Sequence, residues 1–305
     1  MMRLASNVTV RHALSRAREM LAENNIEDAS LESELLLRHT LRQSSLRGDS
    51  VEPGQSLKID RVQLYLELDR QLSPDQSEQF WSLIERRLKG EPSAYIVGHR
   101  EFYGLDFYVN SSVLIPRPET ELLVDKTLEL AQRHALCSMR YTICDIGTGC
   151  GAIAISLALK LPQAKIYATD ISAAALKVAA VNCEKHGVTE RVYLLEGDLL
   201  EPLPEPVDML VANLPYVSES KLSGLNTHGF EPVLALNGGP DGLEKIRRLC
   251  SQTTNNIRPG GGLLLEIGQG QEEAVITLLC NLFPSTKVEI FPDLAGVGRV
   301  VGMIL

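Results

Sequence analysis

The sequence predicts an α/β protein: a doubly wound, mostly parallel sheet of seven strands, preceded by a small helical domain and a β-hairpin linker. Apolar residues recur at helical spacing through the first 90 residues, and aromatic and β-branched residues cluster between 94 and 115. After Pro118, short apolar strands alternate with helices. With 305 residues, 44% of them hydrophobic, the chain can bury two cores. We expect the helical domain over 1–90, the linker over 91–117 and the α/β domain over 118–305.

The composition argues against several classes of protein. The net charge of −9 argues against broad binding to the nucleic-acid backbone, which needs clustered Lys and Arg. No apolar run approaches the roughly 18–20 residues of a membrane span, and the N-terminus lacks the hydrophobic core of a signal peptide. The six cysteines form no C-x-x-C pair, so neither a zinc site nor a disulfide framework is indicated. We therefore expect a cytoplasmic protein that uses neither membrane nor metal.

The first 90 residues show the pattern of amphipathic helices. Apolar residues from Val10 to Leu21 follow the i, i+3, i+4, i+7 spacing, and a second apolar face runs from Ala29 to Leu41. Ser73-Pro74-Asp75-Gln76 is a capping box with proline at the first helical position, and Gly90 fits the stop of the helix that it opens. Nothing in this domain has the composition of a catalytic site.

The linker and the α/β domain follow in order. Aromatic residues punctuated by Gly104 and Asn110 predict a short β-hairpin between 94 and 115. Because no helix separates the last two strands, we expect one edge strand of the sheet to be antiparallel. The strands are expected at 141–146, 165–169, 191–195, 207–212, 262–267, 286–291 and 299–305, and the helices at 119–134, 152–161, 173–186, 243–256 and 272–282.

A glycine-rich loop lies where the first strand meets the next helix, in Asp145-Ile146-Gly147-Thr148-Gly149-Cys150-Gly151. Its three glycines let the backbone turn tightly and approach a ligand. A dinucleotide fingerprint is one interpretation, but the G-x-G-x-G spacing differs from G-x-G-x-x-G. Asp145 also stands just before the loop, where a carboxylate would repel a pyrophosphate and attract a cation.

Aspartates follow the first three strands, at Asp145, Asp170 and Asp198. Each alone could be a helix cap or a turn residue, but the three together indicate a ligand at the carboxyl edge of the sheet. S-adenosylmethionine suits them because it carries a sulfonium and an ammonium and no phosphate. We expect Asp145 to hold the ammonium region electrostatically or through water, Asp170 to accept from both ribose hydroxyls, and Asp198 to accept from the adenine amino group with Leu199 against the ring.

The tetrapeptide Asn213-Leu214-Pro215-Tyr216 follows the apolar run Val207–Ala212. The Asn213 side-chain oxygen can accept a hydrogen bond from an NH2 group. Leu214 precedes a proline, which restricts it to extended φ/ψ and sets the direction of its carbonyl. Tyr216 offers a flat face for stacking. Two acceptors and a ring suit the planar nitrogen of an amide or of an aminopyrimidine, and the tetrapeptide alone leaves both open.

Taken together, these motifs resemble the class I S-adenosylmethionine methyltransferases and, more narrowly, the release factor glutamine methyltransferases of the HemK family. The resemblance spans nearly the whole chain, including the helical domain. The stretches that carry it are Ile115-Pro116-Arg117-Pro118-Glu119-Thr120-Glu121, Asp145–Gly151, Asn213–Tyr216, and Phe230-Glu231-Pro232 leading to Leu236-Asn237-Gly238-Gly239-Pro240-Asp241-Gly242-Leu243.

The resemblance implies methyl transfer to the side-chain amide nitrogen of the glutamine in the Gly-Gly-Gln motif of class I peptide chain release factors. It implies a helical domain that recognises this protein substrate, and we expect a monomer that does not bind nucleic acid. The implied cofactor-binding residues are Asp145, Gly147, Thr148, Gly149, Cys150, Gly151, Asp170, Asp198, Leu199 and Asn213, and the implied substrate residues are Asn213, Leu214, Pro215, Tyr216, Arg117 and Glu231.

Two of these residues keep two interpretations each. Arg117, between two prolines, is either a structural clamp or a substrate contact. Glu231 either braces the Asn213 loop or pairs with a nearby cation.

Leu214 departs from the family pattern, which usually reads Asn-Pro-Pro-Tyr. Adenosine dimethylases of ribosomal RNA often carry Asn-Leu-Pro-Tyr, so N6-adenine methylation is one alternative. These RNA enzymes resemble basic RNA binders and lack the helical domain, whereas this chain is acidic. A second alternative is glutamine methylation of a large-subunit ribosomal protein, although that branch tends to differ around Arg117. A third is a cofactor-binding regulator without catalysis, which would not need to keep both sites.

Overall fold

The computed structural model describes residues 8–46, 60–135, 141–222, 224 and 229–305. Residues 1–7, on which the absence of a signal peptide was judged, lie outside this range. The chain divides into two compact units, one that ends at Gly98 and a larger one from His99 onward. Among the described residues, no helix is long and apolar enough to cross a membrane.

The N-terminal unit is helical, as expected. The capping box is present at the start of α4: Ser73 accepts from the Gln76 N–H, and the Gln76 side chain accepts from the Ser73 N–H. Leu21, Leu36 and Phe80 are among the side chains fully buried in its core. The unit runs past residue 90 because a short helix follows there. Its helices are α1 (Val10–Glu23), α2 (Ala29–Leu46), α3 (Arg61–Leu66), α4 (Pro74–Leu88) and α5 (Ser93–Val97).

The larger unit begins with the predicted hairpin, which is shorter than its expected range. Strands β1 (His99–Phe102) and β2 (Leu105–Tyr108) pair antiparallel. Tyr103 and Gly104 both have positive φ, of 55° and 71°, as a tight hairpin turn requires. The buried Asn182 fastens the hairpin: its Oδ1 accepts from the Tyr108 N–H at 2.7 Å, and its Nδ2 donates to the Tyr108 carbonyl at 2.9 Å.

The larger unit contains one seven-stranded sheet of order β5-β4-β3-β6-β7-β9-β8, which confirms the predicted fold class. Five strands are parallel, and β9 runs antiparallel to both of its neighbours. The antiparallel strand therefore lies inside the sheet, between β7 and β8, and the expectation that it would form an edge is wrong. The strands are β3 (Tyr141–Ile146), β4 (Ala164–Asp170), β5 (Val192–Glu196), β6 (Val207–Ala212), β7 (Ile257–Glu266), β8 (Val288–Pro292) and β9 (Gly298–Ile304).

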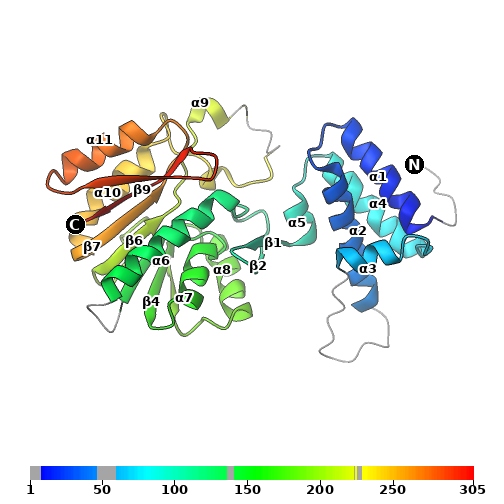
Figure 1. Cartoon of the computed structure of the whole chain (residues 1–305), viewed down its shortest axis with the longest axis horizontal. Coiled ribbons are helices and arrows are strands. Elements are labelled where there is room, and N and C mark those ends of the chain that lie inside the picture. Colours follow the sequence, from blue (N-terminus) through cyan, green and yellow to red (C-terminus); the bar gives the residue numbers. More distant parts are fainter. Residues whose placement is uncertain (1–7, 47–59, 136–140, 223, 225–228) are drawn as a thin grey trace. The chain divides into compact units, whose positions relative to one another are not determined.

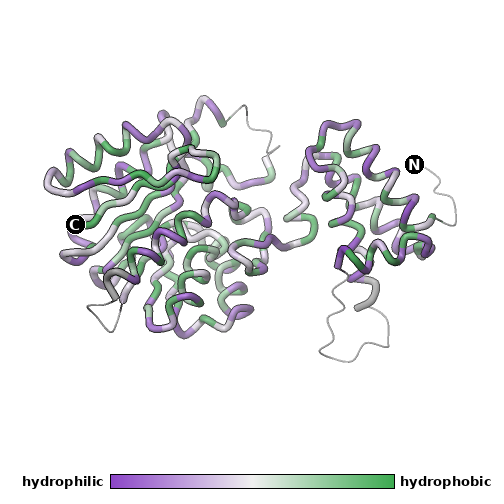
Figure 2. Tube along the Cα trace, viewed as in Figure 1, coloured by the Kyte–Doolittle hydropathy of each residue, from purple (hydrophilic) through white to green (hydrophobic). Residues whose placement is uncertain are grey.

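Helices cover both faces of this sheet (Figure 1). Strand β4 lies on one side of β3 and β7 lies on the opposite side of β6, so right-handed crossovers place their connecting helices on opposite faces. The central strands are therefore mostly apolar, as Figure 2 shows, and β3 is buried throughout. The helices of this unit are η1 (Pro118–Thr120), α6 (Glu121–Ala135), α7 (Ala152–Lys160), α8 (Ala173–Lys185), α9 (Glu219–Leu222), η2 (Val233–Ala235), α10 (Glu244–Asn256) and α11 (Glu272–Leu282).

The order of the strands fixes where a ligand can bind. From β3 the chain moves outward to β4 and β5 and then returns to β6 on the other side of β3. At such a switch point the loops leave the sheet in opposite directions and open a crevice at the carboxyl ends of the strands. The glycine loop follows β3 and the Asn213 tetrapeptide follows β6, so both motifs meet at this crevice.

Candidate active site

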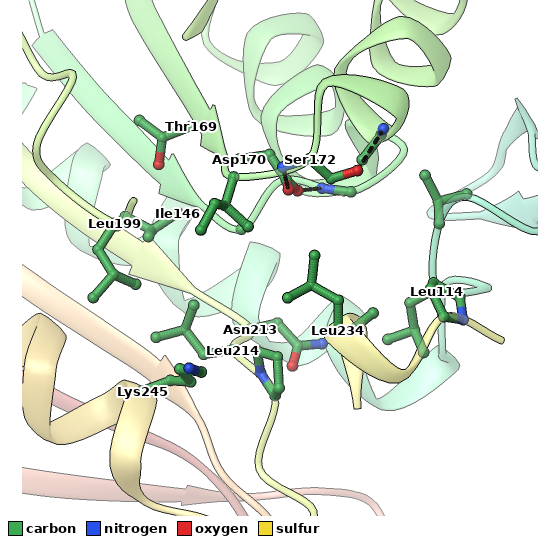
Figure 3. Close-up of a pocket in the computed structure, with 18 of the residues that line it drawn as sticks. Leu114, Ile146, Thr169, Asp170, Ser172, Leu199, Asn213, Leu214, Leu234 and Lys245 are labelled. Atoms are coloured by element: carbon green, nitrogen blue, oxygen red, sulfur yellow. Dashed lines mark hydrogen bonds between the residues drawn. The ribbon is translucent and has the colours of Figure 1, made fainter. Parts of the chain in front are cut away.

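A cavity lies at the switch point, and described residues from seven segments of the larger unit line it. Figure 3 shows Asp170 on one side of the cavity and Asn213 on the opposite side, with Leu114 and Leu234 reaching in from separate segments. The lining residues are Ser112, Val113 and Leu114 of the linker; Ile146, Gly147 and Gly149; Thr169, Asp170, Ile171, Ser172 and Ala175; Asp198 and Leu199; and Asn213, Leu214, Pro215, Pro232, Leu234, Ala235, Lys245 and Arg248.

The glycine loop borders the cavity through Gly147 and Gly149, which have φ of 72° and 57°. No atom other than those of its chain neighbours lies within 4 Å of the position where a Cβ on Gly149 would stand, so the backbone there faces open space. Gly151 serves a different purpose, because a Cβ there would come within 3.0 Å of Ile155 on α7. Among the described residues, the predicted ligand residues Thr148, Cys150 and Gly151 do not line the cavity.

Asp145 lies beneath the loop rather than on the cavity surface, because β3 is covered on both faces. Its Oδ2 accepts from the Thr148 hydroxyl at 2.7 Å and from the Ala154 N–H at 3.2 Å. Its Oδ1 is buried and has no hydrogen-bond partner. Burial raises the pKa of Asp145 to about 7, and these hydrogen bonds oppose the rise. Asp145 thus braces the glycine loop from beneath, and any effect of its charge on a ligand would act across the loop.

Asp170 stands at the end of β4 and lines the cavity, as predicted. Its Oδ2 accepts from the Gly149 N–H and its Oδ1 from the Ser172 N–H, both at 2.9 Å. Each carboxylate oxygen keeps a further acceptor site. Burial raises the pKa of Asp170, and the backbone hydrogen bonds oppose that rise. The carboxylate is therefore fixed in place and still able to accept from hydroxyl groups.

Asp198 and Leu199 also line the cavity, beyond the end of β5. Asp198 forms an ion pair with Arg248 of α10, which the sequence did not predict. Arg248 thereby shares the carboxylate that was expected to accept from an adenine amino group. Leu199 has φ of 53°, a left-handed conformation that is strained for a residue with a branched side chain. This left-handed conformation makes the chain turn between the end of β5 and the cavity wall.

Asn213 and Leu214 lie on the cavity side of the loop after β6. The Asn213 Nδ2 donates to the Thr120 hydroxyl at 3.0 Å, which leaves its Oδ1 available as an acceptor. The Leu214 side chain is buried, and its Cδ2 lies 3.2 Å from the place of a Cβ on Gly147. The leucine that departs from the family pattern therefore packs against the glycine loop and joins the two motifs.

Pro215 and Tyr216 are held from behind by the Gly238–Gly242 turn. A Cβ on Gly238 would stand 2.6 Å from the Pro215 carbonyl oxygen, so only glycine allows this approach. Gln271 donates from Nε2 to the carbonyls of Tyr216 and Gly242, at 3.1 and 3.2 Å. These contacts make the turn a support of the tetrapeptide. Tyr216 itself is partly buried and is not among the residues that line the cavity.

Arg117 and Glu231 pair with each other. The buried Glu231 accepts from Arg117 Nη2 at 2.6 Å and from the Ile115 N–H at 3.2 Å. Glu231 therefore fastens the linker to the segment that follows the tetrapeptide, and of its two interpretations the cation pair is the one observed. Neither residue lines the cavity among the described residues, and the contacts of Arg117 are those of a structural clamp.

The sequence did not single out Thr120 or Glu266, although both are buried next to the tetrapeptide. Glu266 ends β7, and the register that pairs Ala212 with Leu265 sets it level with Asn213 when continued by one residue. Burial raises its pKa to about 7, while Thr120 and Asn213 favour the charged form. A signal was present, since a glutamate at the end of the apolar run Leu263–Leu265 is unusual.

Two family models match parts of the chain. A family model described as the PrmC N-terminal domain matches residues 54–98, and one described as the methyltransferase small domain matches residues 120–230. A release factor glutamine methyltransferase of Moorella thermoacetica is 44% identical over 294 residues, which cover 96% of this chain and 97% of that protein. One of Geobacter sulfurreducens is 38% identical over 302 residues, with 96% of each chain covered.

Solved structures agree on the fold. The hMettl16 catalytic domain in complex with MAT2A 3'UTR hairpin 6 gives a TM-score of 0.54 at 14% identity, covering 74% of this chain and 80% of that one. Likeness at this identity concerns the fold alone. The relatives are similar along nearly the full length of both proteins, through the helical unit as well as the cavity. On that evidence the chain belongs to the release factor glutamine methyltransferases.

Proposed function

We propose that this protein transfers a methyl group from S-adenosylmethionine to the side-chain amide nitrogen of the glutamine in the Gly-Gly-Gln motif of class I peptide chain release factors, in the cytoplasm. The observation that carries the proposal is the orientation of Asn213. Its NH2 group is engaged with Thr120, so its oxygen is left on the cavity as an acceptor for an NH2 group. A side-chain amide is a substrate with such a group.

Several groups that line the cavity or lie beneath it suit S-adenosylmethionine. Asp170 can accept from two hydroxyls, and the backbone at Gly149 borders open space where a ligand can approach. The unpartnered Oδ1 of Asp145 contributes negative charge beneath the loop, which favours a cation above it. Ile171 and Leu199 offer apolar surface for a ring. When bound, the cofactor supplies a methyl group activated by a sulfonium.

The residues of the chain then act by placement. An amide nitrogen is a poor nucleophile because its lone pair is delocalised, so its position decides the rate. The Asn213 oxygen and the Leu214 carbonyl accept the two amide hydrogens and favour the positive charge that grows on the nitrogen. Pro215 restricts Leu214 to extended φ/ψ, and Gln271 holds the carbonyl of Tyr216. These contacts keep both acceptors in one geometry.

Recognition of the whole release factor needs surface beyond the tripeptide, because three residues give little selectivity. Val233 and Leu234 of η2 are exposed, and Leu234 reaches the cavity beside Leu114. We assign these apolar side chains to the backbone and flanks of the substrate loop. We assign to the helical unit a second contact with the release factor, which would raise specificity through a larger interface.

The test measures methyl transfer from labelled S-adenosylmethionine to three acceptors: a release factor, ribosomal RNA and a large-subunit ribosomal protein. We expect label on the release factor and none on a release factor whose tripeptide glutamine is changed to alanine. The Asn213→Ala variant of the enzyme should bind the cofactor and transfer little. Label on RNA alone would overturn the proposal, and binding without any transfer would make the protein a regulator.

A further inference from the structure

The mechanism above leaves the buried carboxylate of Glu266 without a task. Glu266 is 2% exposed, and its Oε2 has no hydrogen-bond partner among the residues that the structure describes. A carboxylate in such surroundings is costly, so its retention beside an active-site loop calls for a reason. Its neighbours suggest one, because the side chains of Thr120 and Asn213 both hydrogen-bond with Glu266, and Asn213 also donates to Thr120.

Thr120 alone cannot decide which way the Asn213 amide points. A hydroxyl both donates and accepts, so it can bond equally to the Nδ2 or to the Oδ1 of an asparagine. If the hydroxyl donated to Asn213, the amide would turn and present its NH2 group to the cavity. Two hydrogen donors would then face each other at the point where the substrate NH2 must be held, and the site would repel its substrate.

An ionised carboxylate removes this ambiguity, because it can only accept. When the Thr120 hydroxyl donates its hydrogen bond to the Glu266 carboxylate, the hydroxyl oxygen can only accept from a further partner. It accepts from the Asn213 Nδ2, as the 3.0 Å contact shows. The Asn213 oxygen must then face the cavity.

We propose that Glu266 is a positioning residue that fixes the amide orientation of Asn213, both through Thr120 and through its own hydrogen bond with the Asn213 side chain, so that the active site presents an acceptor to the substrate NH2 group. This inference rests on the proposed function for its catalytic consequence. The relay itself is a property of the protein without substrate. Its three members come from β7, η1 and the loop after β6, so the fold alone brings them together.

Other charged residues around Glu266 shift the balance between its ionised and neutral forms. Arg299 of β9 favours the ionised form, and Glu119 of η1 opposes it. Burial raises the pKa of the Tyr216 hydroxyl group, and the negative charge of the Glu266 carboxylate raises it further. Arg299 is also bonded to Asp293, at 3.0 Å, so its charge is shared. With the pKa of Glu266 raised to about 7, the relay is fixed above that pH and loosened below it.

Two pairs of variants test the relay through kinetics. Thr120→Val removes the hydroxyl at nearly constant shape, and we expect kcat to fall at least about tenfold. Thr120→Ser keeps the hydroxyl and should restore most of the activity. Thr127→Val is the matched control, since it removes a buried hydroxyl that donates to the Leu123 carbonyl on α6 at 2.7 Å.

Glu266→Gln should lower kcat by about threefold to tenfold, because an amide can turn either its oxygen or its NH2 toward Thr120. It should also abolish the fall of kcat below pH 7 that we expect of the wild type. The KM for cofactor should stay within about twofold in all these variants. A Thr120→Val variant with the kcat of the wild type would overturn the proposal.

A readout without substrate separates the relay from the proposed function. In protein labelled with 15N at asparagine, the Asn213 side-chain resonances should shift with pH, with a midpoint near 7. They should move in Thr120→Val and lose their pH dependence in Glu266→Gln. Resonances insensitive to both changes would refute the relay even if release factor is methylated. A wild type that leaves release factor unmethylated but shows these shifts would refute only the proposed function.

Discussion

Exchanging Glu266 for glutamine should stabilise the protein at neutral and higher pH while it impairs catalysis. Burial raises the pKa of Glu266 from its usual 4.5 to about 7. A carboxyl group whose pKa is higher in the folded than in the unfolded protein stabilises most below the unfolded pKa, and this contribution is lost as the pH rises through the folded pKa. Glutamine has nearly the same shape and does not titrate. The variant therefore keeps the stability that the wild type loses as the pH rises.

The size of the effect follows from the same two values. The gap between 4.5 and about 7, at about 1.4 kcal/mol per pH unit, is worth about 3.5 kcal/mol at most. At pH 5 the glutamate of the unfolded chain has begun to ionise, so part of the loss has already occurred. Between pH 5 and pH 8 we expect the free energy of unfolding of the variant to gain about 2–3 kcal/mol on that of the wild type.

Calorimetry at both pH values is the suitable assay, because it can resolve separate transitions of the two units. The single tryptophan, Trp81, lies in the helical unit, so its fluorescence would follow the wrong part of the chain. Asp241→Asn is the control: the Arg247 hydrogen bond lowers the pKa of that exposed carboxyl to about 2, so its effect should be the same at pH 5 and pH 8. A Glu266→Gln variant that gains nothing between the two pH values would refute the reasoning.

Three further predictions concern the cofactor, the tetrapeptide and the helical unit. Asp170→Ala should raise the Kd for S-adenosylmethionine about hundredfold in titration calorimetry, since hydrogen bonds to a charged group are lost; an unchanged Kd would contradict its assigned role. Leu214→Pro should change kcat less than about tenfold because the carbonyl remains, but lower the melting temperature because a buried side chain shrinks; a hundredfold rise in kcat would contradict this. Removing residues 1–98 should raise KM for intact release factor far more than for a Gly-Gly-Gln peptide, and equal effects would show that the unit does not bind substrate.

The sequence predicted the seven-stranded sheet and the convergence of its motifs for one physical reason. The carboxyl ends of parallel strands meet at one edge, so residues that follow successive strands must lie together. Asp170 and Asn213 accordingly border one cavity. The same reasoning failed for the position of β9, because the sequence shows that a strand lacks a crossover helix and does not show where in the sheet it inserts.

Burial was the second limit of the sequence. Asp145, Asp170 and Asp198 look alike as letters at strand ends, yet they differ in what surrounds them. Asp145 ends the central strand and is covered on both faces, so it braces the loop from within. Asp198 stands where α10 passes, and the ion pair with Arg248 joins positions 50 residues apart. Helix packing brings these two residues together, and no local sequence pattern predicts that packing.

The contacts among Glu266, Thr120 and Asn213 could be predicted from the sequence only in part. Thr120 ends a 3-10 turn, and its partner Asn213 lies 93 positions away. The position of Glu266 beside Asn213 follows from the register of β6 and β7 alone, and the parallel topology nearly determines that register. A charged residue at the buried end of an apolar strand, level with an active-site asparagine on the next strand, is therefore a pattern that could be sought in a sequence. It identifies a group that determines which atoms of the asparagine meet the substrate, without touching the substrate itself.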